Sequence, residues 1–208
     1  MEIQLRDAGK RFRFEWIFRN FNYDFVPNQH TALLGPNGSG KSTLMKALSG
    51  HLSLSKGSIK YLQGESRQVV EIDSIYRNIS FAAPYIELIE EFTLSEMLDF
   101  HRKFKSFQNE LDNKELLEIL GFEKSKNKAL RFFSSGMKQR LKLALAICSD
   151  SAVLLLDEPT TNLDTQGADW YRNLLQEFSH NRTIVVATNT ESDYSFFCKT
   201  EVNLFDYK

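Results

Sequence analysis

The run Gly35–Ser42 most constrains what this chain can fold into, because it fits the pattern G-x-x-x-x-G-K-[ST]. Glycines at these positions let the backbone turn tightly and point successive N–H groups at phosphate oxygens. Lys41 adds a positive charge, and the Ser42 hydroxyl is a Mg²⁺ ligand. The pattern predicts a phosphate-binding loop made of Gly35, Pro36, Asn37, Gly38, Ser39, Gly40, Lys41, Ser42 and Thr43.

The segments on either side of the loop have the periodicity that such a loop requires. Upstream, His30–Leu34 is a short apolar run of strand length. Downstream, Ser42–Leu48 places Leu44, Ala47 and Leu48 on one face of a helix. The order strand, loop, helix puts a helix N-terminus and its dipole at the phosphates. A glycine-rich turn between two ordinary elements is the alternative.

Length and composition exclude several classes of protein. With 208 residues and 42% hydrophobic content, the chain can bury a full core as a single domain, 1–208. A formal net charge of −1 with dispersed signs lacks a basic footprint, so no nucleic-acid partner is expected. Cys148 and Cys198 show no metal-ligand spacing and are expected to be reduced thiols. No apolar run reaches membrane-spanning length, so we expect a cytoplasmic protein that contacts the membrane only through a partner.

The chain begins with a β-rich region. Ile3–Val26 alternates apolar and polar residues in pieces, which favours short antiparallel strands that lead into the phosphate-binding loop. Pro27-Asn28 predicts a turn in which the asparagine tolerates a positive φ. Gly50 is expected to end the helix that follows the loop, and Ser58–Leu62 reads as another strand.

The middle of the chain has a different character. Leucines and a methionine recur at three- and four-residue intervals over Thr93–Leu120, which predicts a helical insert. Thr93 and Glu96 have the spacing of a capping box, in which each side chain accepts from the other's backbone. Gly121 is expected to end the last of these helices.

A second phosphate-related segment follows the helical insert. Ala152–Glu158 is an apolar run that ends in two acids, as expected of a buried parallel strand that delivers carboxylates to the edge of a sheet. Asp157 can hold the Mg²⁺ bound by Ser42, and Glu158 can orient or deprotonate an attacking water. A strand ended by solvated acids is the alternative for this segment taken alone.

Three further features resemble the nucleotide-binding domains of ABC (ATP-binding cassette) ATPases. Ser134–Arg140 is similar to the family signature, usually L-S-G-G-Q or L-S-G-G-M-K-Q-R, and Thr160–Asp164 resembles the D-loop. Phe12 stands where the family places an adenine-stacking aromatic. The resemblance covers the whole chain and implies an α/β P-loop NTPase fold of the ABC ATPase type. Its parts are a mixed RecA-like core sheet, an N-terminal antiparallel β subdomain and an inserted α-helical subdomain at about 85–135.

The resemblance also implies a mechanism that one chain cannot complete. In the family, two nucleotide-binding domains dimerise head to tail around two ATP and Mg²⁺, and they drive a transmembrane permease. Carried onto this sequence, Ser134, Ser135, Gly136 and Asp164 of one copy contact the ATP held by the other. The expected partners are a second copy of the domain and a permease on a separate chain. The region from Pro84 to Phe104 is expected to accept that permease, at the inner face of the cell membrane.

Three positions depart from the family pattern. Ser135 replaces the first signature glycine, Pro84 stands where a glutamine normally contacts Mg²⁺ and water, and Asn189 replaces a histidine that contacts the γ-phosphate. Glu87 is the nearest polar substitute for the glutamine. We expect Lys41, Glu158 and Asn189 to support a hydrolysis that is slower than in relatives with the usual residues.

The missing glutamine and histidine favour a second reading, an ATP-gated dimerisation module with slow or little hydrolysis. Glu158 argues against it, because a domain that only binds ATP does not need that carboxylate. A family member that acts on DNA or ribosomes is the third reading. The chain has neither the coiled-coil insertion nor the second cassette that such proteins usually carry, and its near-neutral charge disfavours it further.

Overall fold

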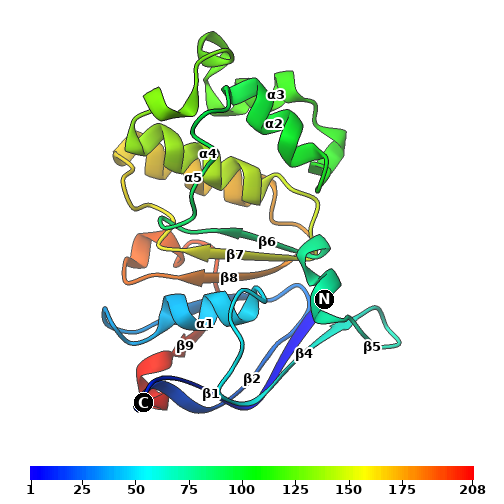
Figure 1. Ribbon diagram of the computed structural model, residues 1–208, viewed down its shortest axis with the longest axis vertical. Helices are drawn as coiled ribbons and strands as arrows, with labels where there is room; N and C mark the ends of the chain where they lie inside the picture. The colour runs from blue at the N-terminus through cyan, green and yellow to red at the C-terminus, as the bar shows by residue number, and fades with distance from the viewer.

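The computed structural model describes residues 1–208 and contains two β-sheets, one parallel and one antiparallel (Figure 1). The core sheet has five strands in the order β6-β7-β8-β3-β9, and every pairing is parallel. Every residue of the adjacent β7 and β8 is buried, so these strands are apolar on both faces, as parallel strands covered by helices must be. The strands are β3 (His30–Leu34), β6 (Ile79–Ala82), β7 (Val153–Asp157), β8 (Thr183–Ala187) and β9 (Thr200–Asn203).

The N-terminal region forms the second sheet, with antiparallel strands in the order β2-β1-β4-β5. Its strands are β1 (Glu2–Phe12), β2 (Glu15–Phe25), β4 (Lys56–Gln63) and β5 (Gln68–Val69). The fold class is therefore confirmed, but the antiparallel strands form a sheet of their own and the core sheet is purely parallel, not mixed.

The alternation over Ile3–Val26 comes from two long strands, not from several short ones. The register between β1 and β2 shifts between Leu5 and Ala8, where Asp7 has a φ of 49°. An extra residue in one strand reverses the face on which the following side chains lie, so the alternation looks broken in the sequence. The Pro27-Asn28 turn is confirmed, with a φ of 61° at Asn28.

The helices follow the capping signals in the sequence. The box at Thr93 is present in full and begins α2, and a second box at Asp112, which we did not predict, begins α3. Gly121 ends α3 in the left-handed conformation, and Gly50 follows the end of α1 with a φ of 78°. The α-helices are α1 (Lys41–Leu48), α2 (Leu94–Arg102), α3 (Asn113–Leu120), α4 (Ser135–Ile147) and α5 (Thr165–Glu177). The 3₁₀ turns are Ile72–Arg77, Gln108–Glu110, Glu123–Ser125, Leu130–Phe132, Glu191–Asp193 and Leu204–Tyr207.

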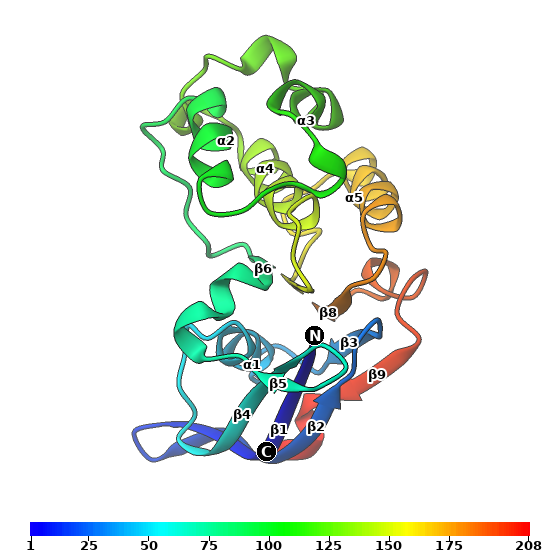
Figure 2. The same cartoon turned by 90° about the vertical axis from the view of Figure 1, so that its right-hand side faces the viewer.

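Two hydrophobic clusters cover the two faces of the core sheet. Leu154 and Leu156 of β7 join the cluster formed with α2 to α5, whereas Leu155 points to the other face. On that face, Leu44 and Leu48 of α1 pack with the antiparallel sheet. Figure 2 shows α2 and α3 at one end of the molecule and the antiparallel sheet at the other. Because the core strands are parallel, the ends of β3, β7 and β8 meet at one edge of the sheet. Figure 1 shows the ends of β7 and β8 beside the start of α1.

Candidate functional site

The predicted phosphate-binding loop joins β3 to α1, and its glycines are required by conformation and by space. Gly35, Gly38 and Gly40 have φ values of 142°, 79° and 103°, which side chains rarely tolerate. A Cβ at Gly40 would also lie 2.5 Å from the Ile17 side chain of β2. The loop backbone therefore passes close to the antiparallel sheet.

Lys41 connects the ends of three core strands. Its side chain is only 6% exposed, and its ammonium donates to the Gly35 carbonyl at 2.7 Å and to Asn189 Oδ1 at 3.0 Å. Glu158 Oε1 lies 3.7 Å from the same nitrogen. The three predicted catalytic residues, Lys41, Glu158 and Asn189, are therefore brought together from α1, the end of β7 and the end of β8.

Asp157 is fully buried at the end of β7. Its Oδ2 accepts a hydrogen bond from the Tyr85 hydroxyl at 2.9 Å, and its Oδ1 is buried with no partner. Burial raises the pKa of Asp157, while the hydroxyls of Ser42 and Tyr85 and the charge of Lys41 oppose that effect. An unpaired carboxylate oxygen beside a serine hydroxyl is the kind of oxygen donor set that Mg²⁺ prefers. The predicted metal ligands Ser42 and Asp157 thus lie together and fit the cation.

Glu158 adopts an unusual backbone conformation for its residue type, with a φ of 45°. Its N–H donates to the Ala187 carbonyl of β8 at 2.7 Å, which holds the turn against the neighbouring strand. Burial raises the pKa of the Glu158 carboxyl, opposed by the Lys41 charge. Left-handed backbone at a non-glycine residue is a recurrent feature of functional sites, where it re-aims a side chain. Here it separates Glu158 from the buried Asp157.

Asn189 uses both ends of its amide. The carbonyl accepts from Lys41, and the NH₂ donates to Asn37 Oδ1 of the phosphate-binding loop at 2.7 Å. The residue that replaces the family histidine therefore bridges Lys41 and the phosphate-binding loop, through an amide that carries no charge of its own.

Thr188 and Asp193 also support this site, although neither residue was predicted from the sequence. The Thr188 hydroxyl lies 2.9 Å from Asp193 Oδ2 and 3.4 Å from Glu158 Oε2. Thr160 donates to the same buried aspartate at 2.9 Å. No local sequence pattern predicts this network, because it joins three separate turns.

The signature and D-loop residues form a separate pocket of about 330 Å³. Ser134 caps α4, its Oγ accepting from the Met137 N–H, and Asp164 caps α5, its Oδ1 accepting from the Gly167 N–H at 2.7 Å. A Cβ at Gly136 would lie 3.0 Å from the Asn162 carbonyl, so the two segments touch through backbone. No residue of the phosphate-binding loop lines this pocket. The two halves of the predicted ATP site lie apart within one chain.

Comparison with known proteins agrees with this geometry. The family model described as ABC transporter matches residues 18–161. The chain belongs to the ABC transporter family. This ABC cassette is 30% identical to the uncharacterized ABC transporter ATP-binding protein YybJ of Bacillus subtilis, an alignment that covers 94% of this chain and 89% of YybJ. Because the family's cassettes hydrolyse ATP, the chain is an ATPase.

Other relatives of the cassette are much longer. The human phospholipid-transporting ATPase ABCA3 is 32% identical over 90% of this chain, but the match spans only 11% of ABCA3. Among solved structures, an ATP-binding subunit of an ABC transporter superposes with a TM-score of 0.82 at 21% identity, over 98% of this chain and 85% of that chain. A dimeric ATP-binding cassette with bound ADP and phosphate gives a TM-score of 0.81 at 20% identity, over 97% and 93%. These structures share the fold of the cassette.

Tyr85, and not Glu87, is the polar residue that reaches the site from the segment after β6 in this ABC cassette. Glu87 instead lines a groove together with Lys142. Tyr85 could not be identified from the sequence, because a tyrosine beside a proline in an irregular segment carries no signal of a distant partner. Phe12 lies at the end of β1, 51% exposed, with the Lys10 ammonium 5.2 Å from its ring centre. Its role in stacking adenine stays a prediction.

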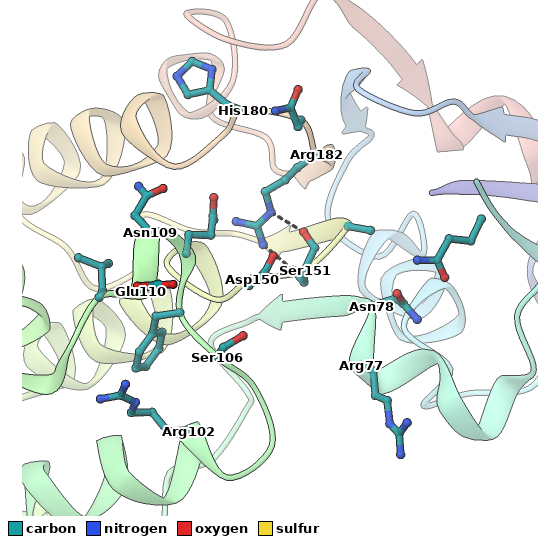
Figure 3. A pocket seen from close by; sticks show the side chains of 16 residues that line it. Arg77, Asn78, Arg102, Ser106, Asn109, Glu110, Asp150, Ser151, His180 and Arg182 are labelled. Carbon is teal, nitrogen blue, oxygen red and sulfur yellow. Dashed lines mark hydrogen bonds between the residues drawn. The ribbon is translucent and has the colours of Figure 1, made fainter. Parts of the chain in front are cut away.

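A cavity of about 930 Å³ lies at the opposite edge of the core sheet (Figure 3). Its wall includes Asp150, just before β7, and the buried Arg182, just before β8. The guanidinium donates to the carbonyls of Ala146, Ile147, Ser151 and Phe178 and to the Ser151 hydroxyl. All of its N–H groups therefore have acceptors within the chain, and none is left for a ligand.

None of the helices combines the length and apolar character needed to cross a bilayer.

Proposed function

We propose that this cassette binds and hydrolyses ATP as a subunit of an ABC transporter, dimerises around two ATP and drives a permease on a separate chain. The observation that carries the proposal is the convergence of Lys41, Asp157, Glu158 and Asn189 at the end of the phosphate-binding loop, with one oxygen of Asp157 left unpaired. Its place would be the cytoplasmic face of the membrane, held there by the permease.

The residues at this edge divide the work of hydrolysis. The N–H groups of Gly35–Thr43 and the Lys41 ammonium hold the phosphates, while Ser42 and Asp157 hold Mg²⁺. When bound, Mg²⁺ neutralises charge on the phosphate oxygens. Glu158 orients the attacking water or accepts its proton, and its raised pKa makes it a stronger base than an exposed glutamate. Asn189 donates a neutral hydrogen bond to the γ-phosphate.

A second copy of the chain would complete each site. The N-termini of α4 and α5 open on one pocket, and N–H groups at helix starts attract anions. The pocket lies apart from the phosphate-binding loop of its own chain, so a phosphate can reach both only across a head-to-tail dimer. Related cassettes solved as dimers support this arrangement.

A groove lies where the permease is expected to dock. Two adjoining hollows, of about 580 and 190 Å³, share Ile86, Glu87, Leu88 and Lys142. Lys138 forms an ion pair with Glu90 in the wall of the first hollow, which Glu91 and Lys142 also line, and apolar side chains line more of the second. An amphipathic helix from a permease suits a groove of this mixed character.

A charge placed in the signature pocket tests the dimer. Ser135 is exposed at the first position of α4, where a glutamate stabilises the helix, so Ser135→Glu should fold normally. Its carboxylate would repel the phosphates held by the other copy. We expect light scattering to show an ATP-dependent dimer for the wild-type chain and for Ser135→Gln, but a monomer that still binds ATP for Ser135→Glu. A dimer in Ser135→Glu would contradict the proposed interface.

An ATP-gated module with slow or little hydrolysis is the second candidate, favoured by Pro84 and Asn189 at the usual glutamine and histidine positions. Phosphate release measured with the dimer separates the two readings, because the module would dimerise with ATP without sustained turnover.

A photo-crosslinker placed at Glu87 in membranes of the source cell tests the proposed contact with a permease. We expect it to capture a membrane-spanning protein, whereas a crosslinker at the exposed Lys114, outside the groove, should not.

A further inference from the structure

Tyr85 is held at the metal-binding edge by contacts with three different elements. Its hydroxyl donates to Asp157 Oδ2 of β7 at 2.9 Å. Its ring lies under the Lys46 ammonium of α1, 4.1 Å from the ring centre, and meets the Phe81 ring of β6 edge-on. A tyrosine that is 41% exposed gains little from burial. The contacts instead fix the direction in which its hydroxyl points.

The hydrogen bond from Tyr85 makes the two carboxylate oxygens of Asp157 different, because only one of them has a partner. A phenol has one proton to donate, and here it goes to Oδ2. Oδ1 stays buried and unpaired. Carboxylates that bind metals are usually held by hydrogen bonds from a second group, which fix the orientation of the ligating oxygen. Tyr85 stands in that relation to Asp157.

We propose that Tyr85 is a positioning residue for a divalent cation bound between Asp157 and Ser42. Its hydroxyl holds Oδ2 and leaves Oδ1 without a partner in the chain, while the Ser42 hydroxyl lies close to the same carboxylate. No glutamine occurs between Ala83 and Thr93, so no amide side chain of this segment takes that place. The inference rests on the proposed binding of nucleotide with Mg²⁺, and it adds a residue of this chain that organises the cation.

Manganese binding measures the effect directly, apart from hydrolysis. The chain, loaded with a non-hydrolysable ATP analogue, is titrated with Mn²⁺ while electron paramagnetic resonance reports the free ion. Tyr85→Phe keeps the ring and its contact with Lys46 but removes the hydroxyl. We expect Mn²⁺ to bind about 10- to 100-fold more weakly to Tyr85→Phe. Binding of the analogue in EDTA should be unchanged.

Two controls show whether the effect runs through Asp157. Tyr76→Phe removes a hydroxyl that is also half-exposed but bonds only to Arg77, and it should bind Mn²⁺ like the wild type. In a chain that already carries Asp157→Asn, Tyr85→Phe should cause no further loss.

Several outcomes would overturn the inference. They are a loss smaller than tenfold in Tyr85→Phe, an equal loss of analogue binding in EDTA, or a further loss in the Asp157→Asn background. If the wild-type chain bound no analogue at all, the proposed function itself would fail. The two failures are therefore distinguishable.

Discussion

Polar residues lie at both ends of the parallel core strands, the carboxyl edge where the strands end and the amino edge where they begin. They differ in whether their polar atoms have hydrogen-bond partners within the chain. At the carboxyl edge, Asp157 has an unpaired oxygen and Glu158 has a strained backbone. At the amino edge, every N–H of Arg182 has a main-chain or hydroxyl acceptor, although a cavity of about 930 Å³ lies there. Polar groups that folding leaves unpaired therefore indicate the site better than the size of a cavity does.

Parallel strands explain the contrast. Their carboxyl ends lead into loops that begin helices, so free N–H groups collect at that edge and attract anions. Their amino ends follow the carboxyl ends of helices, whose last carbonyls lack partners. Arg182 satisfies carbonyls at the ends of α4 and α5, which is a structural role. Substitutions at the first edge should change function, and substitutions at the second should change stability.

The largest effect is expected for Glu158→Gln at the carboxyl edge. Losing the base should lower the rate of ATP hydrolysis by about 100-fold or more, because general bases contribute on this scale. ATP binding should persist, since Lys41 and the loop remain. Phosphate release and fluorescent-nucleotide binding measure the two quantities. Glu87→Gln, in the groove, is the matched control and should hydrolyse ATP at the wild-type rate. Equal rates in the two variants would exclude Glu158 as the base.

At the amino edge, Arg182→Met should lower the stability of the fold without changing ATP binding. The aliphatic stem remains, but the buried carbonyls lose their donors, so the free energy of unfolding should fall by about 3 kcal/mol. Urea denaturation measures this loss. Arg77→Met, an exposed arginine of the same cavity, should change it by less than about 0.5 kcal/mol. Under conditions where the variant is folded, its ATP affinity should equal that of the wild type. A folded Arg182→Met that no longer bound ATP would break the contrast between the edges.

Acid should also destabilise the fold near the amino edge, through His101. Burial lowers the pKa of His101 to about 4, and the Lys105 charge acts in the same direction. Below pH 6.5 the unfolded chain protonates this histidine while the folded chain does not, so stability falls as pH falls towards 4. From pH 7 to 5 this amounts to about 2 kcal/mol.

The measurement is urea denaturation at both pH values. His101→Gln should lose that share of the pH dependence, and His180→Gln, which changes an exposed histidine in the wall of the amino-edge cavity, should keep it. An unchanged pH dependence in His101→Gln would show that its ring is already protonated in the folded chain.

The smallest effect is expected for Asn189→His at the carboxyl edge. A histidine can bring positive charge to the γ-phosphate, which an amide cannot, so turnover should rise a few-fold. Steady-state phosphate release measures it. Asn78→His, beside the amino-edge cavity, should leave turnover unchanged. If Asn189→His also left the rate unchanged, the slow hydrolysis expected of this chain would have another cause.

Much of the carboxyl edge could be predicted because each of its parts has a local signal. The glycine spacing of Gly35–Gly40 reflects backbone conformation, and the apolar run before Asp157 reflects burial on both faces. The same holds for the cap at Thr93 of α2, which satisfies an N–H group only three residues away. Interactions this short depend on neighbouring residues, so the sequence pattern contains them.

Other features could not be predicted, because they join residues far apart in the chain. Tyr85 and Asp157 are separated by 72 positions, and Arg182 bonds to a carbonyl 35 positions away. The bulge near Asp7 hid two long strands, since it reverses the alternation on which a strand prediction depends. Each of these features depends on how the strands pack in the folded sheets, which no local stretch of sequence specifies.

The sequence alone determined a nucleotide-binding loop, a buried strand that ends in two acids, and the starts of α1 and α2, because these rest on backbone freedom, burial and hydrogen bonds between near neighbours. The tertiary structure decided which distant groups share the site: that Asn189 reaches Lys41, that Tyr85 holds Asp157, and that Arg182 serves only the fold. Contacts of this kind depend on how the strands align in the sheet, and no local pattern in the chain specifies that alignment.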